Sequence, residues 1–430
     1  MKKNKFIEST ILLVIGGFIT KILGMIIKII MTKQLGTEGI GLYMMIAPTF
    51  MVLIAIAQLG FPVAISTLVA AGEKNNHKLI LSLIPISLFI NLLFMVLIIL
   101  IAPYLANNLL HDSRLYYPIM AISLVLPFIT ISSIMRGYFL GKQYVFPHVI
   151  SLILEDIVWL IVLMIGIPYF LKMGVAQTLS FIILSNIISE LTSIIILYIF
   201  LPKKTLIKKE YFSPKDSYLK DVFTISLPVA GSRLIGTIGY FFEPIIITYV
   251  LLKVGYSNSY IVNEYGIING YIGPLLLIPS FITLAISQSL IPVVSSYYAS
   301  KNFKYIKYKI AQALKISLSI GIPITIIFLL FPSYILKLIY NNVVGVEYLK
   351  IMAPFYLLLY IQYPLISVLQ AMKNAKKAMN GTLVGMITRT IILFGASFLK
   401  IGMGGLVISI IFNIIFVTIY QSYNVYKLLK

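Results

Sequence analysis

Long apolar segments are the feature that most constrains the fold of this chain. Runs of about 18 or more mostly apolar residues recur along all 430 residues, and a helix needs about 20 such residues to cross the hydrocarbon core of a bilayer. Hydrophobic residues make up 60% of the chain and charged residues 11%, whereas soluble domains average about half and about a quarter. The sequence therefore predicts an all-α, polytopic membrane protein.

The apolar runs predict about twelve transmembrane helices. The first run contains Lys21 and Lys28 and is too long for a cleaved signal peptide, so it is counted as a span. Several runs exceed about 20 residues, which predicts tilted helices or helices that extend beyond the bilayer. The predicted spans are 8–31, 43–70, 79–105, 116–140, 147–170, 176–201, 221–251, 267–298, 308–332, 348–372, 378–399 and 404–426.

The loops between these spans alternate in positive charge. With a cytoplasmic N-terminus, 21 lysines and arginines fall in cytoplasmic segments and seven in external segments. Positively charged loops stay on the cytoplasmic side during insertion. The sequence therefore predicts a protein of the cytoplasmic membrane with both termini in the cytoplasm. The same distribution argues against nucleic-acid binding, because the basic residues lie in short, separate loops and not on one continuous surface.

The longest polar segment divides the chain into two halves. Residues 202–220 contain six lysines and predict a basic cytoplasmic linker between an N-terminal six-helix lobe, 1–201, and a C-terminal six-helix lobe, 221–430. Because six is even, both lobes enter the membrane in the same direction and form a parallel repeat. We expect the lobes to surround a central cavity and to open it alternately to the two sides of the membrane.

Short sequence matches in the same order support a duplication. Residues 20–24 (TKILG) resemble residues 232–236 (SRLIG), and a PTF in span two matches a PSF in span eight. In this alignment Lys21 of the first lobe corresponds to Arg233 of the second. The two positions are therefore predicted to share a role.

Basic residues within the spans are the main candidates for binding a substrate. A charged side chain at the centre of a bilayer costs at least about 2.5–3.5 kcal/mol, so such residues normally face a bundle interior or an aqueous cavity. Lys21 and Lys28 lie two helical turns apart and share a face of span one. For Arg136, near the end of span four, an ordinary anchor at the cytoplasmic surface is an equal alternative. The predicted anion-binding residues are Lys21, Lys28, Arg136, Arg233 and Arg389.

Acidic residues within the spans have two interpretations. Glu155, Asp156 and Glu190 could couple transport to an ion, or could form structural ion pairs with neighbouring bases. Glu243 directly precedes Pro244, where a broken helix would expose backbone carbonyls to a cavity, and a functional role is favoured there.

The sequence predicts no catalytic residues, no metal site and no cofactor. The chain has no cysteine and three histidines far apart in sequence, so thiolate ligands and HExxH-type spacing are missing. The glycine-rich stretch GTEGIG, residues 36–41, lacks both a preceding strand and a following Lys-Ser/Thr and does not predict a phosphate-binding loop. Its glycines instead predict a hinge between the first two spans and close approach of neighbouring helices.

Four segments of the chain carry a family resemblance. They are 24–28, LGTEGIGLYMMIAP (35–48), GFPVAISTLVA (60–70) and RGYFLGKQ (136–143), the last followed by Pro147, Ser151 and Glu155. In these segments the chain resembles the stage V sporulation protein B family. This family belongs to the superfamily that contains multidrug-and-toxin extruders, polysaccharide flippases and lipid II flippases, the MOP (MATE-like) superfamily.

The resemblance implies a flippase that moves a lipid-linked saccharide precursor of the cell wall, spore cortex or a polysaccharide across the membrane. The implied partners are an anionic lipid-linked saccharide, the lipid bilayer and a coupling ion, and we expect the protein to work as a monomer. Two alternatives remain open: an ion-coupled exporter of cationic compounds, and a membrane glycosyltransferase or ligase. The exporter would favour an acidic cavity, and the enzyme would need positioned acids or bases that the sequence does not display.

Overall fold

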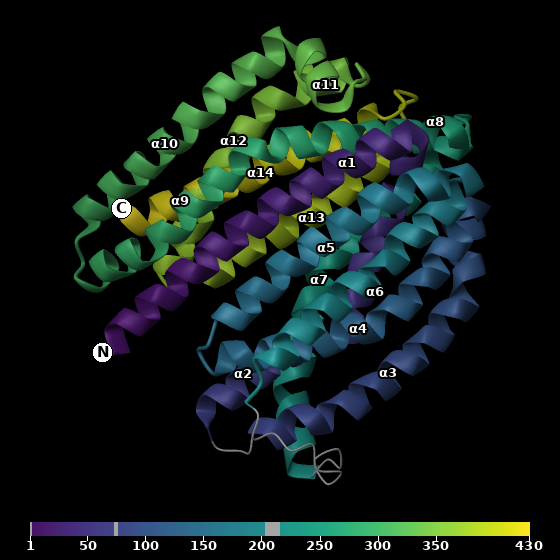
Figure 1. Cartoon of the computed structure of the whole chain (residues 1–430). Coiled ribbons are helices and arrows are strands. Elements are labelled where there is room, and N and C mark those ends of the chain that lie inside the picture. Colours follow the sequence, from purple (N-terminus) through teal and green to yellow (C-terminus); the bar gives the residue numbers. More distant parts are fainter. Residues whose placement is uncertain (1, 73–75, 203–215) are drawn as a thin grey trace. The chain divides into compact units, whose positions relative to one another are not determined.

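The computed structural model describes residues 2–72, 76–202 and 216–430. In these residues all regular secondary structure is helical (Figure 1). The main helices are α1 (Lys2–Gln58), α2 (Phe61–Ala71), α3 (Asn76–Tyr104), α4 (Tyr116–Gly141), α5 (Phe146–Phe170), α6 (Val175–Ile199), α7 (Asp216–Val254), α8 (Asn258–Gly266), α9 (Gly273–Ala299), α10 (Phe303–Leu330), α11 (Pro332–Tyr340), α12 (Val346–Ala371), α13 (Ala375–Ser397) and α14 (Gly404–Leu429).

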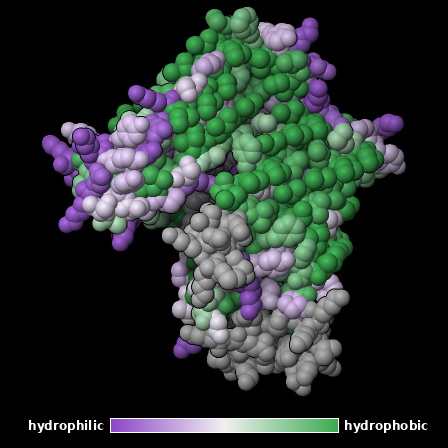
Figure 2. All heavy atoms as spheres, turned by 60° about the vertical axis from the view of Figure 1, so that its left-hand side comes forward, coloured by the Kyte–Doolittle hydropathy of each residue, from purple (hydrophilic) through white to green (hydrophobic). Residues whose placement is uncertain are grey.

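The helices have the length and composition of membrane spans. Eleven segments of the described chain are long and apolar enough to cross a bilayer, and the first of them, Ile11–Ala71, covers 61 residues and contains the first two predicted spans. Many large apolar side chains are exposed, such as Leu100 at 71% and Ile165 at 72%. Figure 2 shows hydrophobic residues over broad areas of one face. This surface suits lipid, and the predicted all-α, polytopic fold is confirmed.

The glycine-rich stretch 36–41 does act as a hinge. Gly36 has φ 69° and ψ −173°, which interrupts the helical geometry inside α1, and only glycine adopts such angles easily. A second break was not predicted: α1 ends at Gln58, Gly60 has φ 70°, and α2 begins at Phe61. The predicted continuous span 43–70 is therefore wrong at this point, because apolarity alone does not report the backbone angles of Gly60.

The described residues group into two compact units. Unit 1 comprises Met1–Leu35 and Leu42–Phe241, and unit 2 comprises Gly36–Gly41 and Phe242–Lys430. The boundary between the units falls inside α7. The predicted linker 202–220 lies mostly at 203–215, outside the described residues, and the division of the chain into two six-span lobes stays a prediction.

In unit 1, α4 is the central helix. It packs against α2, α3 and α6, and α6 packs in turn against α5. The core where these helices meet includes Phe61 and Ile65 of α2, Phe139 of α4 and Leu197 of α6, all essentially inaccessible to solvent. This packing fixes α4, α5 and α6 side by side and so positions the charged residues that they carry.

Two glycines allow α4 to approach α2 closely. A Cβ atom at Gly137 would lie 2.6 Å from the carbonyl oxygen of Pro62, and one at Gly141 would lie 2.6 Å from that of Ser66. The two glycines are one turn apart on the same face of α4, as in the small-residue seams of other membrane helices. The backbone atoms opposite them cannot move aside as a side-chain end could.

Replacing Gly137 with alanine is expected to lower the stability of the protein by about 1–3 kcal/mol, because the added methyl group overpacks a backbone contact. Thermal unfolding in detergent micelles measures the effect. Gly24→Ala is the matched control, since a Cβ at this helical glycine meets nothing within 4 Å, and alanine favours a helix. Equal midpoints for the two variants would contradict the close-packing role of Gly137.

Unit 2 is built around α12. This helix packs against α9, α10 and α14, and α14 packs against α13. The core includes Val294 of α9, Ile306 of α10 and Val368 of α12, all fully buried. The short helix α11 was not predicted, because its nine residues are too few to form a separate apolar span. Within the same unit the residues of the hinge pack on α8, where Thr37 donates a hydrogen bond of 2.6 Å to Oδ1 of Asn263.

Candidate functional site

A buried cluster of charged residues connects three helices of unit 1. Arg136 on α4 forms an ion pair with Glu155 on α5. The same Nη2 atom donates a hydrogen bond of 2.7 Å to Oγ of Ser193 and lies 3.5 Å from Oε2 of Glu190, both on α6. Only 14% of the Arg136 side chain and 8% of the Glu190 side chain are exposed. We call Arg136, Glu155, Glu190 and Ser193 the unit 1 ion cluster.

Asp156 and Lys21 lie near the unit 1 ion cluster. Asp156, the next residue on α5, lies in the electrostatic field of both Arg136 and Lys21. Helix α1 approaches α5 closely at Gly16, where a Cβ atom would collide with Val149. The packing of α1 on α5 therefore brings Lys21 towards the acidic face of α5. Three predicted acids and two predicted bases thus come together in unit 1.

A separate ion pair lies within unit 2. Arg389 on α13 pairs with Oε2 of Glu243 on α7, and Tyr265 on α8 donates a hydrogen bond of 3.0 Å to Oε1 of the same carboxylate. The side chains of Arg389 and Glu243 are 14% and 8% exposed. Each unit therefore contains one buried arginine whose charge is balanced by glutamate.

The predicted helix break beside Glu243 is wrong. Helix α7 runs without interruption from Asp216 to Val254 and passes through Pro244. Oγ1 of Thr248, one turn further on, donates a hydrogen bond of 2.8 Å to the carbonyl oxygen of Pro244. Proline is tolerated inside membrane helices because side chains and neighbouring helices satisfy the local backbone groups. Glu243 therefore acts as the partner of Arg389 and does not mark an exposed backbone.

Three of the predicted anion-binding residues have no acidic partner in an ion pair within the described chain. Lys21 is exposed and Lys28 is partly exposed, and neither side chain makes a hydrogen bond or ion pair there. Arg233 is exposed on α7, and its Nη1 atom donates a hydrogen bond of 3.0 Å to Oε1 of Gln58 at the end of α1. All three belong to unit 1. An anion could bind to their side chains.

Open space lies at three glycines that neighbour these bases on their helices. Gly17 and Gly24 lie on the same face of α1 as Lys21 and Lys28, and a Cβ atom at either glycine would meet nothing within 4 Å. Gly236, one turn beyond Arg233 on α7, is equally unobstructed. A surface that packed against lipid or another helix would normally carry large apolar side chains at such positions. Small residues beside lysine and arginine instead suit a hydrated space.

Some partners of the charged residues could not be recognised as functional from the sequence. Ser193, Tyr265 and Gln58 are uncharged, and each contacts a charged residue far away in the sequence. Ser193 offers one signal, since it lies three residues after Glu190 and hence on the same helical face. No comparable signal marks Tyr265 or Gln58.

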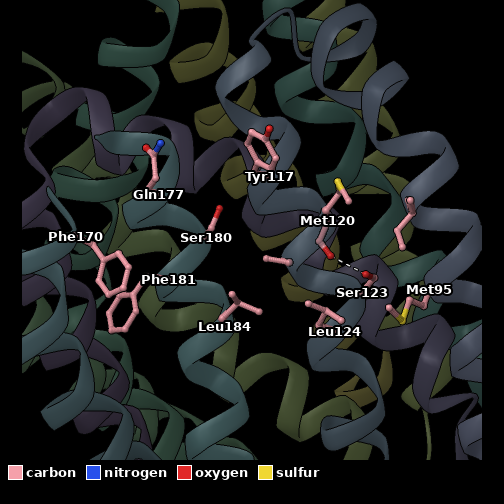
Figure 3. Close-up of a pocket in the computed structure, with 12 residues that line it drawn as sticks. Met95, Tyr117, Met120, Ser123, Leu124, Phe170, Gln177, Ser180, Phe181 and Leu184 are labelled. Atoms are coloured by element: carbon pink, nitrogen blue, oxygen red, sulfur yellow. Dashed lines mark hydrogen bonds between the residues drawn. The ribbon is translucent and has the colours of Figure 1, made fainter. Parts of the chain in front are cut away.

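An apolar cavity of about 670 Å³ lies between α3, α4 and α6 in unit 1 (Figure 3). Leu124 of α4 and Leu184 of α6 point into it from opposite sides, and the stacked rings of Phe170 and Phe181 close one end. Its polar groups are few, and one of them, the hydroxyl of Ser123, already donates to the carbonyl oxygen of Met120 at 2.6 Å. No charged residue lines the cavity. It suits a hydrocarbon chain and not an anionic group.

The described residues show no metal-binding arrangement. No group of three or more histidine, cysteine, aspartate or glutamate side chains comes together closely enough to hold a metal ion in the ranges 2–72, 76–202 and 216–430. The carboxylates of Glu155 and Glu190 contact Arg136 instead.

Comparisons with known proteins agree with this architecture. Residues 6–298 match the family described as Polysaccharide biosynthesis protein, and residues 270–395 match the family described as MatE. The chain is 35% identical to Stage V sporulation protein B of Bacillus subtilis (strain 168), over 100% of this chain and 85% of that protein. It is 23% identical to Lipid II flippase MurJ of the same organism, over 77% of this chain and 64% of that protein.

The fold is also similar to a solved structure. A multidrug resistance MATE family transporter of the MOP superfamily, captured in an inward-facing conformation, aligns with a TM-score of 0.71 and 18% identity, over 95% of this chain and 94% of that one. At this identity the likeness concerns the fold alone. One family model matches residues 6–298, and a 35% identical relative is covered to 85% of its length. The chain therefore belongs to the polysaccharide biosynthesis protein family.

Proposed function

We propose that this protein is a flippase that moves a lipid-linked saccharide, carried on a phosphate or pyrophosphate group, across the cytoplasmic membrane. The observation that carries the proposal is the set of three bases that form no ion pair in the described chain, Lys21, Lys28 and Arg233. Lysine binds phosphate as a point charge, and arginine can bind it through two parallel hydrogen bonds. A cationic substrate would be repelled from the same residues.

The five predicted bases divide into two roles in this proposal. Lys21, Lys28 and Arg233 contact the anionic group of the substrate. Arg136 and Arg389 are held by glutamates and maintain the packing of their units. Asp156 interacts electrostatically with Lys21, and Glu155 and Glu190 contact Arg136, which also acts on Asp156. A coupling ion that changed the charge of Asp156 would therefore change the affinity for an anion beside Lys21.

Two relatives support the substrate class through their names. One is a stage V sporulation protein and another a lipid II flippase, which agrees with a precursor of the cell wall or spore cortex. The proposal places both termini in the cytoplasm, has two lobes that open alternately to each side, and treats the monomer as the working unit. The lipid tail stays in the bilayer while the saccharide crosses.

Reconstitution in liposomes tests the proposed function. Wild-type protein is expected to increase the rate at which a fluorescent polyprenyl-pyrophosphate saccharide becomes accessible to a membrane-impermeant quencher, relative to protein-free liposomes. Transport of a fluorescent cationic dye, measured in the same liposomes, is expected to remain at the background rate. Transport of the dye without movement of the saccharide lipid would contradict the proposal and favour the exporter.

A further inference from the structure

We propose that a groove between α10 and α14 in unit 2 binds an anionic phospholipid. The groove has a volume of about 490 Å³ and lies between the first turns of α10 and the last turns of α14. Two lysines, Lys307 and Lys430, contribute to it together with the apolar side chains of Ile310, Leu314 and Leu429. It is distinct from the unit 1 residues assigned to the transported substrate.

The walls of the groove are apolar over its depth. Helices α10 and α14 both pack along α12, and the core that they share with it includes Ile310 of α10, Leu365 of α12 and Val425 of α14. Ala311 is the smallest residue in the groove and leaves room between the two helices. A narrow apolar space between two membrane helices is complementary to an acyl chain.

Lys307 gives the groove a positive charge that no acidic side chain of the described residues pairs with. It is exposed, and no hydrogen bond or ion pair of its side chain occurs in the described chain. Its neighbour Lys309 differs, since Nζ of Lys309 lies 3.0 Å from Oε1 of Gln312 and about 5.3 Å from the ring centre of Tyr305. Lys309 is thus held by its own helix, whereas Lys307 is available to a ligand.

Acidic side chains are rare in the part of unit 2 that forms the groove. From residue 265 to residue 430 the sequence contains one acid, Glu347. Glu347 lies in the first turn of α12, whereas the groove adjoins the end of α12 near Ala371. At a rise of about 1.5 Å per residue the two ends of α12 are about 36 Å apart. Among residues 265–430, no acidic side chain would therefore lie near an anionic headgroup at Lys307 and Lys430.

The position of the groove matches the depth of a phospholipid headgroup. The charge distribution of the loops predicts that this end of unit 2 faces the cytoplasm, and basic pockets between helices on that side suit anionic lipids. Tyr308 and Tyr426 are 61% and 64% exposed here, and tyrosine is enriched at the membrane interface. A phosphate beside the lysines with an acyl chain along the groove satisfies both halves of the site, whereas a soluble anion would leave the apolar half empty.

Binding measured by native mass spectrometry of the purified chain in detergent tests the proposal. Wild-type protein is expected to bind phosphatidylglycerol more tightly than phosphatidylcholine, by about fivefold for each lysine that contacts the lipid. The variant Lys307→Gln/Lys430→Gln is expected to lose this preference. The control Lys304→Gln/Lys376→Gln removes two exposed lysines at the same end of unit 2 that do not line the groove, and it is expected to keep the preference.

A second variant tests the acyl-chain half of the site. Ala311→Phe fills the groove and is expected to weaken binding of both lipids at least severalfold, without removing charge. Glycerol 1-phosphate, which has the headgroup chemistry but no acyl chain, is expected not to compete. The proposal is overturned if Lys307→Gln/Lys430→Gln keeps the preference for phosphatidylglycerol, or if Ala311→Phe binds both lipids as the wild type does. It is also overturned if glycerol 1-phosphate competes as well as the lipid, because the groove would then be a site for a free phosphate.

Discussion

Arg136→Met is expected to destabilise the protein by about 3–5 kcal/mol, the cost of breaking a buried ion pair by removing one partner. Arg136 is the only base in direct contact with Glu155 and Glu190 among the described residues. Without it, both carboxylates must stay charged without a partner or take up protons, and either outcome loses the interaction between α4, α5 and α6. Denaturant and thermal unfolding in detergent micelles measure the loss.

Arg233→Met is the matched control for this prediction. It makes the same chemical change in the same unit, but Arg233 is exposed and bonds only the uncharged side chain of Gln58 in the described chain. Its effect on stability is expected to stay within about 1 kcal/mol. If the two variants unfolded at the same denaturant concentration, Arg136 would not have the stabilising role assigned to it.

Neutralising the whole unit 1 ion cluster separates charge from packing. The triple variant Arg136→Met/Glu155→Gln/Glu190→Gln removes the base and both acids with little change in volume. Replacing a buried set of charges in this way is often close to neutral, so the triple variant is expected to recover most of the stability lost in Arg136→Met. A triple variant as unstable as the single one would show that the guanidinium acts through its shape or its bond to Ser193.

The number of membrane crossings could be predicted from the sequence because it depends on local composition. Apolar runs and loop charges are properties of short segments, and the eleven candidate spans, with two crossings in the first, agree with the expected twelve. The break at Gly60 and the helix α11 were missed, because each depends on backbone angles or on a segment of nine residues. Hydropathy is insensitive to both.

The role of each charged residue could not be predicted in the same way. Arg136, Arg233 and Lys21 share the same sequence signal, a base at bilayer depth. Tertiary packing distinguishes them. The partners of Arg136, Glu155 and Glu190, lie 19 and 54 residues away in the sequence. They are on other helices, and the sequence alone does not show which face of each helix points towards Arg136. From the sequence, ion pairing was one of two interpretations of the acids in the spans, and nothing indicated which base each acid would contact.

Lys21→Gln/Arg233→Gln is expected to lower the rate of saccharide-lipid transport at subsaturating substrate by about a hundredfold or more. A hydrogen bond to a charged group contributes about 1.5–3 kcal/mol, and the variant removes two such donors from the proposed phosphate contacts. Lys28→Gln is expected to have a smaller effect, because its side chain is less exposed than that of Lys21. The measurement is quencher accessibility of the fluorescent saccharide lipid in liposomes that contain equal amounts of folded protein.

Two control variants separate a loss of positive charge from a loss of folded protein in this experiment. Lys21→Arg/Arg233→Lys keeps both positive charges and is expected to retain most of the transport rate, whereas the glutamine variant loses it with an unchanged unfolding midpoint. Lys315→Gln removes an exposed lysine of α10 in unit 2, outside the proposed phosphate contacts, and should transport as the wild type does. Wild-type transport by Lys21→Gln/Arg233→Gln would mean that these bases do not contact the moving anion, even if the protein flips lipid. Retained activity in the charge-keeping variant and loss in the neutral one would instead identify electrostatic attraction as the contribution of the two residues.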